Sequence, residues 1–289
     1  MRAAGLPVNR SLENVMHPAI APGNIAVVTG AANGIGAAAA RRFAQAQMRV
    51  CLADADAEGL SRLRGELGDQ AVAVTVDVSD RGAMEGLART VAELGPVSVL
   101  MNNAGIGGGG DALSNPDGWE LVLGVNLMGV LHGVQAFAPA MAASSRPGLV
   151  INTGSKQGVT MPPGDTAYNV SKAGVKALTE GLAHTLRNTP GCQVSAHLLV
   201  PGFTYTGMIA RRIPERPPAA WTSEQVVERM FEGLARGDFY LWCEDNETPR
   251  AVDDKRVLWT AGDIVENRPA LSRWHPDWKD RFDRFMAGE

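Results

Sequence analysis

The segment that decides the expected fold is Thr29-Gly30-Ala31-Ala32-Asn33-Gly34-Ile35-Gly36. An apolar run at residues 25–29 precedes it, and an alanine-rich stretch of helical composition at residues 34–46 follows it. Glycines permit positive φ angles and let a ligand approach the backbone closely. The N–H groups at the start of a helix carry partial positive charge and attract phosphate. A strand, a glycine-rich turn and a helix in this order therefore predict a site for a dinucleotide pyrophosphate.

The same alternation continues along the chain. The further apolar runs predict strands at 49–54, 71–76, 97–101, 149–153, 193–200 and 239–243. The stretches between them predict helices at 57–66, 81–94, 119–143, 167–187 and 223–235. Continuously apolar strands that alternate with helices are typical of a parallel sheet covered on both faces. We therefore expect an α/β protein, a Rossmann-type fold with a doubly wound, seven-stranded parallel sheet.

The chain length and the composition of three segments predict the domain organisation. The seven strands use most of the 289 residues, so we predict a single catalytic domain over residues 23–245. Residues 1–22 are expected to form an N-terminal extension. Residues 203–221 are rich in proline and arginine and are expected to form a lid. The tail, residues 246–289, carries three tryptophans and is expected to pack on the body or at a subunit interface.

Composition excludes several classes of protein. The net charge is −4, so there is no global basic field and nucleic acid is not an expected partner. Cys51, Cys192 and Cys243 lie far apart, without metal-ligand spacing, and we interpret them as reduced core thiols of a cytoplasmic protein. We expect no metal site. No apolar run is judged long enough to span a membrane, and residues 1–24 lack the apolar core of a secretory signal.

A carboxylate ends the second predicted strand. Asp54 lies 18 residues after Gly36, where a carboxylate can accept hydrogen bonds from both adenosine ribose hydroxyls and repel a 2′-phosphate. No basic residue follows it directly, so the sequence favours NAD over NADP. Asp77-Val78 ends the third strand, where Asp77 could meet the adenine amino group or instead cap the next helix.

Three polar side chains predict acid/base chemistry. Ser155 follows the fifth predicted strand, and Tyr168 and Lys172 are spaced i and i+4, so they share one face of a helix. An ammonium beside a phenol favours the phenolate and lowers the phenol pKa. Taken singly, Tyr168 could be a core residue and Lys172 a solvated one. Only three tyrosines occur in the chain, which makes a chance pairing after Ser155 improbable.

The ordered set of motifs resembles the short-chain dehydrogenase/reductase family over about residues 25–208. The motifs are TGAANGIG, Asp54, Asp77-Val78, NNAG at 102–105, Asn126, Ser155, YNVSK at 168–172 and PGFTYT at 201–206. The resemblance implies a nicotinamide cofactor, here NAD(H), and a Ser-Tyr-Lys set completed by an asparagine.

The resemblance also implies a role for each matched residue. Tyr168 would be the general base in alcohol oxidation and the acid in ketone reduction, and Ser155 would orient the substrate oxygen. Lys172 would lower the Tyr168 pKa and bind the nicotinamide ribose. Asn126 would hold a water that relays protons from Lys172, or it could simply distort its helix. Besides the glycine-rich turn, the implied cofactor contacts are Asn103, Ala104, Gly105, Tyr168, Lys172, Pro201, Gly202, Thr204 and Thr206.

The sequence departs from the family pattern in two places. Gly154 stands where a second serine is usual before Ser155, and Lys156 follows. The usual glycine-rich ending after the last strand is replaced by residues 240–245 and the long tail, which puts the geometry of a homotetramer in doubt and makes a homodimer an option beside it.

The expected substrate pocket is mostly apolar. Its candidates are Gln157, Met161, Phe203, Tyr205 and Met208, with Val159, Pro162, Pro163, Ile209 and Trp221 as further lining residues. This composition favours a secondary alcohol or ketone with a bulky hydrophobic or aromatic group. The lid arginines, Arg211, Arg212 and Arg216, could bind an anionic group or be solvated. The alternatives are a non-catalytic dinucleotide sensor or scaffold on the same fold, and a dihydrodiol or steroid-type dehydrogenase.

Overall fold

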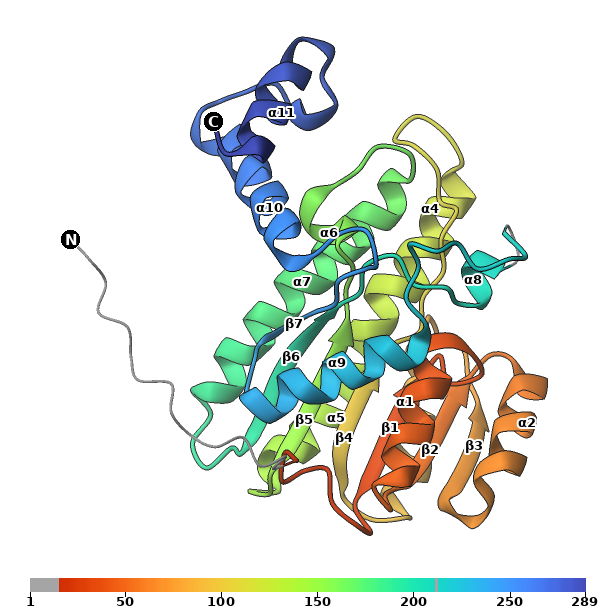
Figure 1. Ribbon diagram of the computed structural model, residues 1–289. Helices are drawn as coiled ribbons and strands as arrows, with labels where there is room; N and C mark the ends of the chain where they lie inside the picture. The colour runs from red at the N-terminus through yellow and green to blue at the C-terminus, as the bar shows by residue number, and fades with distance from the viewer. Residues whose placement is uncertain (1–15, 211–212) are drawn as a thin grey trace.

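The computed structural model describes residues 16–210 and 213–289, and it confirms the expected fold class (Figure 1). Seven parallel strands form one sheet in the order β3-β2-β1-β4-β5-β6-β7. Their bounds are Ile25–Thr29 (β1), Arg49–Asp54 (β2), Ala71–Thr75 (β3), Val97–Asn102 (β4), Gly148–Thr153 (β5), Val194–Val200 (β6) and Tyr240–Trp242 (β7). The strand order reverses between β1 and β4. In open α/β sheets ligands bind at such a reversal, outside the carboxyl ends of the strands.

The helices follow the expected alternation. Their bounds are Gly34–Gln45 (α1), Ala57–Leu67 (α2), Arg81–Ala92 (α3), Pro116–Leu123 (α4), Gly129–Ala143 (α5), Gln157–Thr160 (α6), Thr166–Arg187 (α7), Gly207–Ala210 (α8), Ser223–Arg236 (α9), Arg250–Val265 (α10) and Lys279–Ala287 (α11). The prediction of one continuous helix over residues 119–143 is wrong. It begins at Pro116, and a π-helical turn at Gly124–Met128 interrupts it.

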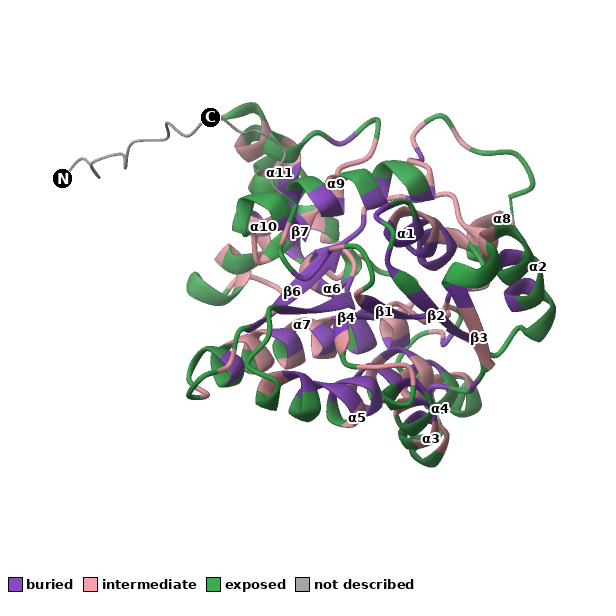
Figure 2. Ribbon diagram, turned by 90° about the horizontal axis from the view of Figure 1, so that it is seen from below, coloured by how far each residue is buried: buried purple, intermediate pink, exposed green. Residues whose placement is uncertain are grey.

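Two layers of helices bury the sheet (Figure 2). Helices α1, α2 and α9 cover one face, and their core is centred on side chains such as Phe43 and Met230. Helices α3, α5 and α7 cover the other face around Met84 and Phe137. All five residues of β1 are buried, because a central strand has helices on both sides.

Side-chain caps fix where several helices begin. Asp80 accepts a hydrogen bond from the Ala83 N–H and caps α3. The alternative that Asp77 caps this helix is therefore wrong. The Asp77 carboxylate instead accepts from the Ser79 N–H and hydroxyl, and so closes a turn between β3 and α3.

The helical stretch Pro116–Ala143 corrects an expectation about apolar runs. Its 28 residues are long and apolar enough to cross a membrane by length and composition, with a mean hydropathy of 1.6 in its most apolar window. Half of that window is buried within the protein, where α5 packs on β4 and β5. The core helix of a soluble α/β domain has these same properties, because it lies against an apolar sheet.

The C-terminal tail folds into a small helical module that projects beyond the sheet (Figure 1). Trp259 of α10 lies at its centre, and the Arg268 guanidinium stacks 4.4 Å from its ring. Phe282, Phe285 and Trp278 surround the same ring, with centroid distances of 5.2 to 6.3 Å. The module meets the body where α10 packs on α6.

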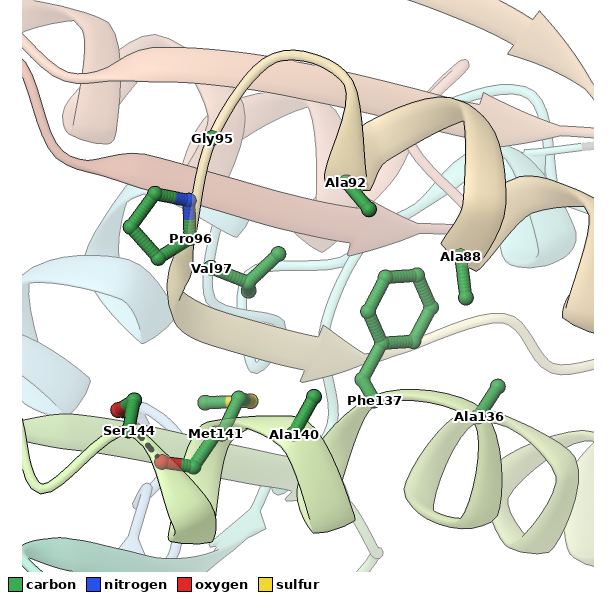
Figure 3. A pocket seen from close by; sticks show the side chains of 10 residues that line it. All are labelled: Ala88, Ala92, Gly95, Pro96, Val97, Ala136, Phe137, Ala140, Met141 and Ser144. Carbon is green, nitrogen blue, oxygen red and sulfur yellow. Dashed lines mark hydrogen bonds between the residues drawn. The ribbon is translucent and has the colours of Figure 1, made fainter.

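A small apolar cavity of about 130 Å³ lies between α3, α5 and the start of β4 (Figure 3). Its walls include Phe137, Met141 and Pro96. It lies at the amino end of β4, whereas the expected site lies at the carboxyl ends of the strands. The cavity is therefore separate from the candidate active site.

Candidate active site

Two elements, β5 and α7, bring Ser155, Tyr168 and Lys172 together. Ser155 follows the carboxyl end of β5, and Tyr168 and Lys172 lie one turn apart on α7. The Ser155 hydroxyl lies close enough to the Tyr168 phenol to lower its pKa. The buried Lys172 ammonium donates to the Thr153 carbonyl at 2.8 Å and lies 5.7 Å from the centre of the Tyr168 ring. The three side chains that the sequence spacing predicts to act together therefore lie close to one another.

Burial governs the pKa values of both Tyr168 and Lys172. Burial raises the pKa of Tyr168, the nearby Asp165 carboxylate raises it further, and only the Ser155 hydroxyl lowers it. Burial lowers the pKa of Lys172 to about 8. Desolvation of the phenolate therefore dominates the pKa of Tyr168 in the protein alone, and the expected lowering of that pKa by Lys172 stays a prediction. The same desolvation makes Lys172 a weaker base that can release its proton near neutral pH.

Asn126 lies in the π-helical turn and is fully buried. Its side-chain amide pairs with the Ile106 backbone, accepting from the N–H and donating to the carbonyl, both at 2.8 Å. A Cβ on Gly105 would lie 3.4 Å from both the Asn126 Oδ1 and the Lys172 Nζ. Asn126 is thus part of a helix distortion, as one of the two alternatives held, and it also faces the same point as Lys172.

The glycine-rich turn has the geometry that a close backbone approach requires. Gly30 has a φ of +66°, which L side chains rarely adopt. A Cβ on Gly36 would lie 2.0 Å from the Gly30 carbonyl oxygen, so no larger residue fits there. Asn33 stands at the cap position of α1 but makes no side-chain cap hydrogen bond, which leaves the first N–H groups of that helix to another acceptor.

Asp54 is attached to this turn. Its carboxylate accepts from the Ala32 N–H at 2.9 Å and from the Asp56 N–H at 3.0 Å. A carboxylate has about four lone-pair positions, so further acceptor capacity remains for two ribose hydroxyls. Asp56, two residues on, adds a second carboxylate at the end of β2 and caps α2.

Several other candidate cofactor residues lie around the turn. Thr206 packs against Gly34, where an added Cβ would be 3.2 Å from its Cβ. Asn103 donates from its amide to the Thr29 carbonyl at 3.2 Å, and Ala104 lies beside Gly30. These residues therefore line the carboxyl ends of β1 and β4.

A second group of candidates makes contacts within the protein, and its role toward a cofactor stays a prediction. Asp77 is exposed and bound to Ser79, and the Val78 side chain is buried against Gly129. Ile35 is buried in the core, and Thr204 is bound to the Gly202 carbonyl. Pro201 is buried beneath the site and binds the Lys156 N–H through its carbonyl.

The candidate substrate residues come from two segments. Gln157 and Met161 belong to α6 and its end, directly after Ser155, and Met161 has a left-handed φ of +50°. In residues 203–221, the expected lid, the Met208 sulfur lies 3.7 Å from the Cβ position of Gly107, so this segment reaches the loop after β4. Phe203 pairs through its backbone with Trp221. The Tyr205 hydroxyl donates to the Pro214 carbonyl and so holds the lid itself. Arg211 and Arg212 lie outside the described residues.

Sequence reasoning missed two residues that contribute to the geometry. The Thr153 carbonyl accepts from Lys172, and a backbone acceptor leaves no side-chain signal. Asp165 caps α7 by accepting from the Tyr168 N–H, and its other oxygen accepts from the Gly108 N–H at 2.8 Å. An aspartate three residues before the tyrosine was the available signal, because aspartate is a preferred helix cap. Among residues 16–210 and 213–289, no cluster of three or more metal-ligating side chains occurs.

Comparison with known proteins identifies the family. The family model described as short chain dehydrogenase matches residues 24–217. The chain belongs to the short-chain dehydrogenase/reductase family. It is 34% identical to a 1-deoxy-11-beta-hydroxypentalenate dehydrogenase of Streptomyces exfoliatus over 86% of this chain and 93% of that protein. It is 38% identical to an L-tagatose-forming galactitol 2-dehydrogenase of Cereibacter sphaeroides (68% and 76%) and 33% identical to a 3beta-hydroxysteroid dehydrogenase 2 of Eggerthella lenta (73% and 84%).

Solved structures of the same family resemble this chain. A short-chain dehydrogenase/reductase from Burkholderia phymatum in complex with NAD is 35% identical with a TM-score of 0.76, covering 86% of this chain and 96% of that one. A metagenomic short-chain oxidoreductase in complex with NADP is 32% identical with a TM-score of 0.62, covering 75% and 92%. The chain is therefore an oxidoreductase whose relatives are dehydrogenases of hydroxyl groups, and family members with this fold bind NAD or NADP.

Proposed function

We propose that this protein is an NAD(H)-dependent oxidoreductase that interconverts a secondary alcohol and a ketone, with Tyr168 as general acid/base. The observation that carries the proposal is the convergence of Ser155, Tyr168 and Lys172 at the carboxyl end of β5. This point lies beside the strand-order reversal, where a dinucleotide binds in such folds. A protein that only sensed the dinucleotide would need none of these three side chains.

The residues around the glycine-rich turn fit a dinucleotide. The uncapped N–H groups of α1 would bind pyrophosphate oxygens, and Gly36 admits no side chain that could block their approach. Asp54 would bind the adenosine ribose hydroxyls through its remaining acceptor capacity. A nicotinamide cofactor held by these residues would supply the hydride acceptor for alcohol oxidation and the hydride donor for ketone reduction.

Two carboxylates support NAD over NADP. Asp54 and Asp56 both lie at the end of β2, and a 2′-phosphate there would bring like charges close together. No arginine or lysine follows Asp54 directly to offset that repulsion. The preference rests on this local charge, because family relatives use either cofactor.

The chain's own groups perform the proton transfer. In oxidation, Tyr168 as phenolate takes the hydroxyl proton of the alcohol, while Ser155 donates a hydrogen bond that orients the substrate oxygen. Lys172, whose pKa burial lowers to about 8, supplies positive charge near the phenolate and passes protons to the Asn126 side of the site. In reduction the Tyr168 phenol returns the proton to the ketone oxygen.

The residues expected to line the substrate pocket support a bulky hydrophobic substrate. Met161, Phe203 and Met208 offer flexible or flat apolar surface, and Met208 reaches across to Gly107. Relatives named for hydroxypentalenate and hydroxysteroid substrates support this size, whereas the galactitol enzyme is named for a small polyol. A steroid-type alcohol therefore belongs in the first substrate panel.

The test combines binding and turnover. The purified protein is titrated with NADH and NADPH, and NADH oxidation is then followed over a panel of fused-ring and aryl ketones. We expect tighter binding of NADH and turnover of a few bulky ketones. Binding without turnover over the whole panel would favour the sensor alternative, and equal binding of NADPH would contradict the assigned role of Asp54.

A further inference from the structure

A nearly buried ionic cluster lies directly beside Ser155, the serine proposed to orient the substrate oxygen. The Lys156 ammonium is 2.6 Å from an oxygen of Asp253 and 3.1 Å from an oxygen of Asp245. The three side chains are 13%, 2% and 11% exposed, in the order Lys156, Asp253, Asp245. The Trp242 indole donates to Asp253 at 2.9 Å, and Arg256 lies 3.7 Å from its other oxygen. Two cations thus balance two anions, and we call these four charged residues the Lys156 network.

The network joins three segments of the chain. Lys156 follows Ser155, and its N–H donates to the Pro201 carbonyl at 3.1 Å. A Cβ on Gly202 would lie 2.8 Å from the Lys156 Nζ and 2.9 Å from the Glu244 carbonyl oxygen. The Ser155 segment, the loop after β6 and the segment after β7 that leads into the C-terminal tail therefore meet at the Lys156 side chain.

The same lysine begins the short helix α6, which connects the network to α7. The Gln157 N–H donates to the Ser155 hydroxyl at 3.1 Å. A Cβ on Gly158 would lie 2.5 Å from the Lys172 backbone carbonyl carbon, so α6 packs tightly on α7 at the level of Lys172. A shift of Lys156 would thus move the Ser155 oxygen relative to Tyr168.

Stability alone does not account for such a cluster. Removing charges from water is expensive, and a buried ion pair can often be replaced by apolar residues without loss of stability. Charged groups with fixed hydrogen bonds instead define one arrangement of the segments that they join. The position of this cluster, one residue from Ser155, is where a fixed arrangement matters for proton transfer.

We propose that Lys156 is a positioning residue, through which the C-terminal tail holds Ser155 and the Pro201-Gly202 loop in the arrangement that turnover requires. The inference rests on the proposed oxidoreductase function. It makes the tail, and α10 in particular, part of the active-site architecture. The sequence pattern supports this reading, because both carboxylate partners come from the segment that replaces the family's usual glycine-rich ending.

The test compares Lys156→Met and Asp245→Asn with a matched control, Lys279→Met. Lys279 pairs with Asp283 on α11 of the same module, but both side chains are mostly exposed. We measure kcat and KM on the best ketone of the panel, NADH affinity, and amide hydrogen exchange of residues 155–161 and 201–206. The full-length protein is used throughout.

We expect kcat to fall by about 10- to 100-fold in Lys156→Met, as for a small misplacement of a catalytic group, with NADH affinity within about threefold of the parent. Exchange at 155–161 should accelerate in Lys156→Met and Asp245→Asn but not in Lys279→Met. A purely structural anchor would lower the melting temperature and leave kcat unchanged at 25 °C, which would overturn the proposal.

Two further outcomes are decisive. If Lys156→Met does not fold, Asp245→Asn takes its place, because it keeps the lysine paired with Asp253. If the parent protein turns over no ketone, the proposed function fails, and the exchange data still decide the positioning claim: unchanged exchange at 155–161 in Asp245→Asn contradicts it.

Discussion

Replacement of Gly36 by alanine should damage the cofactor site through one atom. In the structure the added Cβ would lie 2.0 Å from the Gly30 carbonyl oxygen and 2.7 Å from the Asn103 amide nitrogen. Real Cβ atoms do not approach backbone atoms this closely, so the glycine-rich turn must move away from α1. That movement displaces the N–H groups that we propose bind pyrophosphate.

The magnitude follows from two opposing effects. Alanine favours a helix over glycine by about 1 kcal/mol. Overpacking costs about 1 to 3 kcal/mol, and contact with rigid backbone places this site at the upper end. The net loss of about 2 kcal/mol in unfolding free energy should lower the melting temperature by about 4 to 8 °C. NADH affinity should fall by about tenfold or more, because it depends on the displaced turn.

Gly65→Ala is the matched control. Gly65 lies in α2, is exposed, and an added Cβ would meet no atom within 4 Å. Only the helix-propensity gain applies there, so this variant should melt about 2 to 4 °C higher and bind NADH normally. The assays are differential scanning fluorimetry and NADH fluorescence titration. If Gly36→Ala behaved like Gly65→Ala in both, the reasoning on the turn would be refuted.

Three further results are expected. Asp54→Ala should weaken NADH binding and relax the discrimination against NADPH, and an unchanged ratio of the two dissociation constants would count against its role. Since the folded pKa of Lys172 is about 8, below its ordinary 10.5, the unfolded chain binds more protons between these values and stability rises there with pH. Chemical denaturation of the parent against Lys172→Met should show this as a relative gain approaching about 3 kcal/mol from pH 7.5 to 10.5; a flat difference would contradict it. Burial raises the pKa of Cys51 and Cys243 to about 12, so a thiol reagent should modify only Cys192 in the native protein, and two or three fast-reacting thiols would be the contrary result.

Most of the fold could be predicted because the elements are locally consistent. Continuous apolar runs gave β1 and β2 at their observed bounds, since central parallel strands are buried on both faces. The π-helical turn at Asn126 could not be predicted from periodicity, because its extra residue is stabilised by the tertiary hydrogen bonds of Asn126 with Ile106. The apolar length of Pro116–Ala143 was underestimated because the break in the helix is local, and only its α5 part packs on the sheet.

The candidate site could be predicted where spacing alone determines contact. Tyr168 and Lys172 share a helix, so their proximity follows from the sequence. The direction of the Tyr168 pKa shift could not be predicted from the sequence, because it depends on burial and on Asp165 rather than on Lys172 alone. The Lys156 network joins residues about 90 positions apart, and no local pattern indicates that Asp245 and Asp253 lie beside Ser155. The assembly as homodimer or homotetramer stays a prediction.

The most direct test of the account is Tyr168→Phe, which removes only the phenol oxygen. The variant and the parent are compared for NADH binding and for turnover on the best ketone of the panel. The account predicts NADH affinity within about threefold of the parent and a loss of turnover of about 100-fold or more, because the proton donor is gone while the cofactor site is intact. Turnover near the parent's rate with normal NADH binding would show that Tyr168 is not the acid/base, and the central claim would fail.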